Sequence, residues 1–234
     1  MALPKLNVPQ YTVELPSTGE QISMRPFLVR EEKVLMIALE SNDPVQISNA
    51  VRTVIESCYD LEDMDALTNF DIEMLFLQLR AKSVGENMRI QVKCQHDECE
   101  GMTPVDINVD DVVVDNIDQE RTVILDEKTK LGIEFKYPSV NDIVKMDLEK
   151  IDSFEGTVDF IAGCVAAIFD ENEIYDADHD EIKEFLETLN GEQFRNVQQW
   201  FNNAPSVYYN LQFVCEKCTK PNEVELRGLN SFFS

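Results

Sequence analysis

Two pairs of cysteines, Cys94/Cys99 and Cys215/Cys218, constrain the fold of this chain more than any other feature. Each pair lies in a polar turn between two strand-like runs that alternate apolar and polar residues. The flanking runs are 88–93 and 105–109 for the first pair, and 210–214 and 223–226 for the second. A strand, a cysteine turn and a second strand, present twice, can bring four thiolates tetrahedrally around one zinc ion. The pattern therefore predicts one structural, zinc-ribbon-like site with Cys94, Cys99, Cys215 and Cys218 as its ligands.

Other interpretations of these cysteines remain open. Two disulfides or free thiols would also use them, although the absence of an export signal favours a reducing compartment and so disfavours disulfides. His96, inside the first turn, could replace one cysteine ligand; otherwise it is a polar residue of the turn. Cys58 and Cys164 lie on or beside apolar helical stripes, where a thiol is typically a small core residue.

The sequence also indicates an internal duplication, in which one structural unit occurs twice, and a duplication would determine the architecture. A hairpin that runs into a proline-started helix is expected at 11–27 and again at 121–138. The copies align at Thr12 with Thr122, Pro26 with Pro138, and Cys94 with Cys215. We predict an extended arm at 1–10, a first repeat at 11–115 and a second at 116–234. Each repeat would hold a hairpin, about three helices and one strand–cysteine turn–strand, joined to the other at the shared zinc.

Helical spacing of apolar residues dominates the rest of the sequence, so the expected class is α+β. Asp43 followed by Pro44 predicts a helix start, and Gly85 a helix end. Helices are expected at 30–41, 43–58, 68–85, 141–149, 158–168, 182–189 and 194–201. The apolar tail 229–234 either packs on the protein's own core or anchors the chain to a partner.

The charge balance excludes several classes of partner. The net charge is −25 and the pI about 4.3, whereas binding to duplex nucleic acid or to an anionic membrane needs a basic surface. The acidic surface either steers the chain towards basic partners or serves solubility alone. No run approaches the ~20 apolar residues that cross a bilayer. We expect a cytosolic protein that binds neither nucleic acid nor membrane.

Catalytic patterns are poorly represented. A four-thiolate zinc has no open position for a substrate, and the sequence has no Gly-x-Ser-x-Gly elbow, phosphate loop or dinucleotide fingerprint. The segment 170–181 is similar to a calcium loop, but Ile174 and Tyr175 occupy positions that need an oxygen ligand and a glycine. We interpret it as a solvated acidic linker. No enzyme activity and no small-molecule substrate are expected.

Two segments carry a family resemblance. Residues 15–40, with the block Arg25–Lys33 at their centre, resemble the opening of the T4-type phage baseplate hub assembly proteins, and 76–85 is similar to a second block of that family. The resemblance implies a non-enzymatic assembly factor or hub-associated component of a contractile tail. Its partners would be phage hub and tail proteins, met in the host cytoplasm during assembly or in the virion tail baseplate.

The resemblance leaves some questions open at this stage. The zinc prediction rests on the cysteines and not on the family. The block 25–33 is either a functional face or a helix start with a solvated charged side. The alternative functions are a zinc-dependent enzyme and a zinc-ribbon regulator that binds a protein partner.

Overall fold

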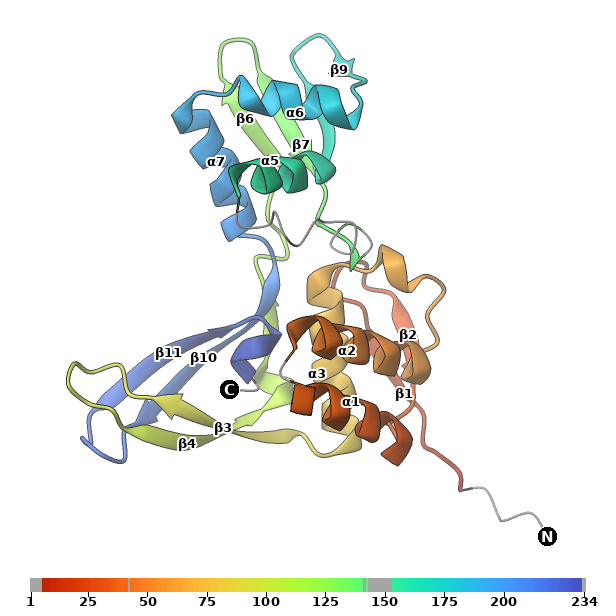
Figure 1. The fold of residues 1–234 in the computed structure, drawn as a ribbon, viewed down its shortest axis with the longest axis vertical. Coiled ribbons are helices and arrows are strands. Elements are labelled where there is room, and N and C mark those ends of the chain that lie inside the picture. Colours follow the sequence, from red (N-terminus) through yellow and green to blue (C-terminus); the bar gives the residue numbers. More distant parts are fainter. Residues whose placement is uncertain (1–5, 42, 141, 143–152, 233–234) are drawn as a thin grey trace. The chain divides into compact units, whose positions relative to one another are not determined.

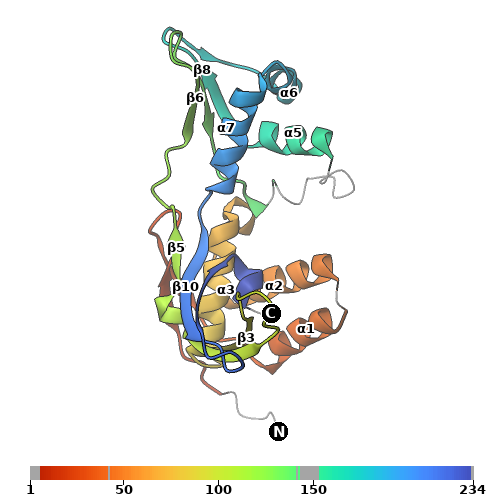
Figure 2. The same ribbon diagram turned by 90° about the vertical axis from the view of Figure 1, so that its left-hand side faces the viewer.

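The structure is a computed structural model that describes residues 6–41, 43–140, 142 and 153–232 (Figure 1, Figure 2). The described residues form six α-helices and several small antiparallel sheets, so the predicted α+β class is confirmed. The chain divides into two compact units. Unit 1 comprises Met1–Met64, Phe70–Asp115 and Ser206–Ser234, and unit 2 comprises Asp65–Asn69 and Asn116–Pro205.

Within its described residues, unit 1 combines three helices with three β-hairpins, one of which is extended by a further short strand. The helices are α1 (Val29–Ser41), α2 (Pro44–Cys58) and α3 (Asn69–Ser83). The strands are β1 (Tyr11–Glu14), β2 (Gln21–Met24), β3 (Asn87–Lys93), β4 (Met102–Asn108), β5 (Val113–Asp115), β10 (Ser206–Val214) and β11 (Pro221–Arg227). Strand β1 pairs with β2, β3 with β4, and β10 with both β11 and β5, all antiparallel. Short 3₁₀ turns occupy Met64–Ala66, Val109–Asp111 and Leu229–Phe232.

The core of unit 1 forms where α3 meets the hairpins β3–β4 and β10–β11. Burial along β3 alternates residue by residue, as a half-buried strand requires, and its inward side chains are Met88, Ile90 and Val92. Helix α3 buries residues on several sides because it lies between the pair α1–α2 and the hairpins (Figure 1, Figure 2). This shared core brings the two hairpins together.

Unit 2 is a four-stranded antiparallel sheet with helices over one face (Figure 2). Its strands, in sheet order, are β6 (Thr122–Asp126), β7 (Leu131–Phe135), β8 (Val165–Phe169) and β9 (Ile174–Tyr175). Its described helices are α5 (Phe154–Gly163), α6 (His179–Glu187) and α7 (Gly191–Asn202). Asp178 and Asn190 begin α6 and α7 with capping boxes. The rings of Phe135 and Trp200 stack at 4.7 Å in the core of the unit.

The hairpins expected at 11–27 and 121–138 are both present. The helix expected at 158–168 is wrong in its second half. Helix α5 ends at Gly163, and Val165 and Ile168 lie on β8, where they pair with Phe135 and Ile133 of β7. Apolar residues three positions apart are compatible with a helix, but residues 165–169 form a strand because they pair with β7. The expected linker 170–181 contains β9 and the start of α6. The helix expected at 141–149 lies outside the described residues, apart from residue 142.

The two compact units do not coincide with the two predicted repeats, because Ser206–Ser234, at the end of the second repeat, belong to unit 1. The two-repeat interpretation therefore stays a prediction. The tail turns back onto unit 1, where Phe232 is buried in the core. Among the described helices, none combines the length and the apolar character needed to span a bilayer.

Candidate metal centre

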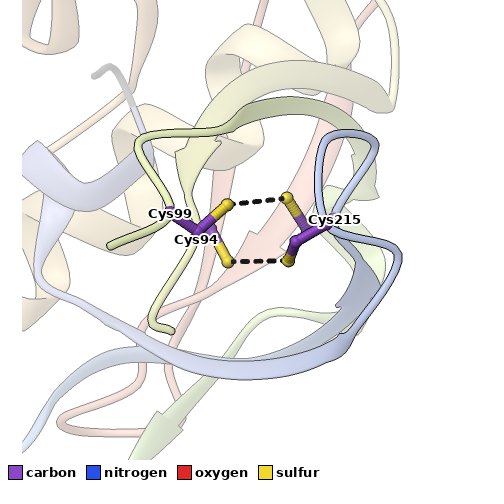
Figure 3. A group of neighbouring side chains, drawn as sticks. Cys94, Cys99 and Cys215 are labelled. Atoms are coloured by element: carbon purple, nitrogen blue, oxygen red, sulfur yellow. Dashed lines mark hydrogen bonds between the residues drawn. The ribbon is translucent and has the colours of Figure 1, made fainter. Parts of the chain in front are cut away.

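The four predicted ligands come together inside unit 1 (Figure 3). Cys94 and Cys99 lie in the turn between β3 and β4, and Cys215 and Cys218 lie in the turn between β10 and β11. The Sγ atoms all lie within 4.8 Å of one another. Cys94 Sγ is 3.6 Å from Cys218 Sγ, and Cys99 Sγ is 3.8 Å from Cys215 Sγ. The four residues can therefore bind a metal ion.

The sulfur spacing agrees with that of a tetrahedral zinc site. With Zn–S bonds of about 2.3 Å, sulfurs at the corners of a tetrahedron are about 3.8 Å apart. Two of the observed separations are close to this value. A disulfide requires sulfurs about 2.05 Å apart, and all six cysteines of the chain are free thiols in this structure.

Backbone turns shape each half of the site. Cys94 N–H donates to Gly101 C=O at 2.8 Å, which closes the first turn, and Cys215 N–H donates to Lys220 C=O at 3.0 Å, which closes the second. Glu98 (φ 64°) and Thr219 (φ 58°) adopt the left-handed conformation within these turns. Such conformations tighten the chain so that both sulfurs of a pair face the same side.

Position 101 requires a glycine because there is no room for a side chain there. A Cβ atom at this position would lie 2.8 Å from Cys215 Sγ, 2.9 Å from Lys217 Cβ and 3.3 Å from Cys99 Sγ. Contacts below 3.0 Å force a shift, and here the atoms that would move belong to the turn that carries Cys215 and Cys218. The missing side chain therefore allows the two turns to approach.

Polar contacts tie one turn to the other. Asn222 is buried; its Oδ1 accepts Gln95 N–H at 2.8 Å, and its Nδ2 donates to Lys220 C=O at 3.0 Å. His96 Nε2 lies 2.9 Å from Pro221 C=O. His96 thus reaches across to the second turn through a backbone carbonyl, and it is outside the group of four sulfurs. Glu216 N–H also donates to Thr103 Oγ1 at 3.1 Å.

The thiols have unequal pKa values. A hydrogen bond from Cys218 N–H, with a further one from Lys217 N–H, lowers the pKa of Cys215 to about 6 against the opposing effect of burial. A hydrogen bond from Gly101 N–H lowers the pKa of Cys99, but burial and the neighbouring thiols raise it to about 11. Four crowded sulfurs cannot all carry a negative charge by themselves, whereas a cation at their centre favours the thiolate at each.

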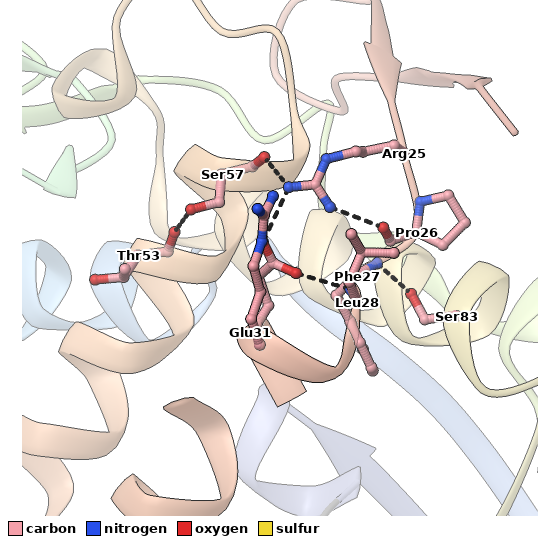
Figure 4. A network of polar contacts seen from close by, with 9 residues as sticks. Arg25, Pro26, Phe27, Leu28, Glu31, Thr53, Ser57 and Ser83 are labelled. Carbon is pink, nitrogen blue, oxygen red and sulfur yellow. Dashed lines mark hydrogen bonds and ion pairs between the residues drawn. The ribbon is translucent and has the colours of Figure 1, made fainter. Parts of the chain in front are cut away.

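The block 25–33 holds a second polar cluster, but its centre is structural (Figure 4). Glu31 is buried and accepts from Arg25 at 3.0 Å, Arg30 at 2.6 Å and Leu28 N–H at 2.8 Å. The Arg25 guanidinium also donates to Ser57 C=O at the end of α2. Burial raises the pKa of Glu31, but these hydrogen bonds outweigh it and lower the pKa to about 2. The cluster fixes the start of α1 against α2.

Sequence reasoning named the four sulfurs but not the residues that support them. Gly101 carries a signal, since a glycine two residues after a candidate ligand suggests a close approach of backbone. Asn222 and Thr103 carry none, because their roles depend on contacts across more than 100 positions of sequence.

Comparison with known proteins agrees with the resemblance seen in the sequence. No curated protein matches the chain, and no solved structure matches it. The family model described as T4 bacteriophage base plate protein matches residues 8–234, nearly the entire chain. The chain therefore belongs to the T4 bacteriophage base plate protein family.

Proposed function

We propose that this protein is a non-enzymatic assembly factor or hub-associated component of a phage tail baseplate, and that it acts by binding other baseplate proteins. The family match over residues 8–234 is the observation that carries the proposal. Hub and tail proteins would be its partners, met in the host cytoplasm during assembly or in the virion tail baseplate. The acidic net charge of −25 suits basic protein surfaces and opposes contact with nucleic acid.

The metal in this proposal is a structural Zn²⁺ held by Cys94, Cys99, Cys215 and Cys218. Support comes from four sulfurs within 4.8 Å of one another, two pairs of which are near the spacing of a tetrahedral zinc site, and from the backbone donors to Cys215 and Cys99. The ion would join hairpin β3–β4 to hairpin β10–β11. Four protein sulfurs fill the coordination of zinc, so the arrangement favours a structural over a catalytic role. A zinc-dependent enzyme would need an open position among these ligands.

The repeat interpretation belongs to the proposal as well. Both halves begin with a hairpin, β1–β2 or β6–β7, and both end with a hairpin that carries two cysteines, β3–β4 or β10–β11. In an experimental structure, residues 11–115 and 116–234 should superimpose in the same element order. Different connections within the two halves would reject the duplication.

The function is tested in infected cells. A phage that lacks this gene should fail to assemble baseplates, and the wild-type gene supplied in trans should restore them. Affinity capture of the tagged chain should recover hub or tail proteins. Normal particles without the gene would refute the proposal. Detection of the chain in purified mature tails would identify a permanent component, and its absence there a transient assembly factor.

The zinc is tested separately on purified protein. We expect one Zn²⁺ per chain by elemental analysis, because the ion stabilises the meeting of the two hairpins. Structural zinc in small peptides contributes about 10–16 kcal/mol. Cys215→Ala should lose the ion and lower the melting temperature, as a strong chelator should for the wild-type protein.

Cys58→Ala is the matched control, because Cys58 is also a buried thiol of unit 1 but lies outside the cluster. It should keep its zinc. The metal assignment would be refuted if the purified protein contained no zinc and added zinc did not change its melting temperature. That result would leave the proposed baseplate role unaffected.

A further inference from the structure

Helix α1 exposes more large apolar side chains than a surface helix needs. Glu31 and Ala38 are its buried residues. In contrast, Val29 is 79% exposed, Met36 56%, Ile37 55% and Leu39 56%. An exposed apolar group of this size on one element commonly marks a protein-binding surface.

The outward side of α1 is also balanced in charge. Lys33 follows Val29 by four residues, and Met36 and Glu40 follow these two by seven, so all four lie on the same side of the helix, opposite Ala38. Arg30 and Glu32 add one more charge of each sign along the exposed surface. In a chain of net charge −25, this local neutrality lowers the repulsion that another acidic molecule meets at α1.

We propose that α1 is a self-association surface that binds α1 of a second copy of this chain in antiparallel orientation. The two-fold axis would pass between Met36 and Ile37. Lys33 and Glu40 lie 3.5 residues to either side of this point, about 5 Å along the helix. The rotation therefore places Lys33 of each copy beside Glu40 of the other, because a two-fold contact pairs residues reciprocally.

Several features favour a second copy over a basic partner. A basic partner would be drawn to an acidic surface, whereas the exposed charges of α1 are two cations, Arg30 and Lys33, and two anions, Glu32 and Glu40. The two-fold contact pairs opposite charges twice and covers the apolar side chains of one helix with those of the other. This inference goes beyond the proposed function, since a baseplate protein can act as a monomer or as a dimer.

Sedimentation equilibrium of the full chain tests the proposal. The wild-type protein should form dimers in a concentration-dependent manner. Met36→Glu should be monomeric because it places a carboxylate at the axis. Val84→Glu is the matched control: Val84 is 63% exposed and lies just after α3, so this variant should dimerise as the wild type does. Circular dichroism confirms that each variant is folded.

A charge exchange makes the test specific to this arrangement. Lys33→Glu and Glu40→Lys should each weaken self-association about tenfold, since exposed ion pairs contribute little individually but two are reversed. An equimolar mixture of the two variants should regain the wild-type dissociation constant, because the mixed dimer restores opposite charges at both contacts. A monomeric wild type, a dimer that survives Met36→Glu, or a mixture that stays dissociated would each overturn the proposal. Binding of α1 to a different baseplate protein, with the chain itself monomeric, would also overturn it.

Discussion

Gly101 occupies a position where a single methyl group would enter the group of four cysteines that is the candidate metal centre. We expect Gly101→Ala to weaken zinc affinity about tenfold or more, a loss typical of changes to residues that support metal ligands. The cause is the 2.8 Å approach of the new Cβ to Cys215 Sγ. Competition with a chromophoric chelator measures the affinity.

Gly163→Ala is the control for Gly101→Ala. An added Cβ at Gly163, at the end of α5, meets no atom within 4 Å. It should leave affinity unchanged and stabilise the chain slightly, since alanine restricts the unfolded state. Equal zinc affinity in both variants would show that the space around Gly101 does not matter.

Glu31 should make stability depend on pH. Its pKa is lowered from 4.5 to about 2 in the folded chain, so its stabilising effect is complete above about pH 4.5 and disappears as pH falls towards 2. Glu31→Gln should cost about 1–3 kcal/mol at pH 7, because the charged hydrogen bonds with Arg25 and Arg30 are lost. The difference from wild type should shrink at pH 3.

Urea unfolding of both proteins at each pH gives that difference, and comparison at equal pH cancels any effect of pH on metal binding. The control is Glu32→Gln, since Glu32 is the exposed neighbour and should change stability by less than about 0.5 kcal/mol. A gap between wild type and Glu31→Gln that stays constant from pH 7 to pH 3 would contradict the pKa assignment.

Some residues of the candidate site can be predicted from the sequence and others cannot. The spacing of Cys94, Cys99, Cys215 and Cys218 between alternating runs identifies the sulfurs, because that spacing has few structural uses. Asn222 joins the two turns through contacts whose partners lie far away in sequence. Glu31 shows the same limit: an acidic residue in a charged helix start is ordinarily solvated, but the guanidinium of Arg25 allows its burial.

Elements were predictable where local patterning is strong. The Asp43–Pro44 start of α2 and the apolar stripes of α6 and α7 follow helix rules, and the cysteine hairpins follow strand alternation. Strand β8 was mistaken for helix, because a short apolar run fits both periods and only pairing with β7 distinguishes them. Strand β5 was not predicted at all, since three residues carry no usable pattern.

Strand β5 matters because it is paired with β10 across a long gap in sequence. Asp115 pairs with Ser206, Val114 with Val207 and Val113 with Tyr208, and Arg227 forms an ion pair with Asp115. The chain therefore leaves unit 1 at Asp115 and returns beside it at Ser206. Residues 116–205 form an insertion whose flanking residues, Asp115 and Ser206, are paired in a sheet, an arrangement that insertions in compact domains commonly use.

At the scale of the whole molecule, this arrangement predicts that unit 1 can bind the proposed zinc without the insertion. Paired residues of an antiparallel ladder have Cα atoms about 5 Å apart, which a two-residue turn can span. Replacing residues 116–205 with Asn-Gly should give a chain that binds one Zn²⁺ and unfolds cooperatively, because all four cysteines, α3 and both cysteine hairpins remain. Elemental analysis and thermal circular dichroism measure both properties.

Removing residues 116–205 also removes backbone contacts that these residues make with the segment Asp65–Asn69 of unit 2. Leu67 C=O accepts Val140 N–H and Thr68 bridges to Ser139, so the segment Asp65–Asn69 loses these backbone partners. We therefore expect a lower melting temperature than in the full chain, but one that still rises when zinc is added. The same shortened chain with Cys215→Ala should show no response to zinc. A shortened chain that stays unfolded with zinc present would mean that the folding of unit 1 depends on unit 2, and the insertion would then be part of the scaffold of the site.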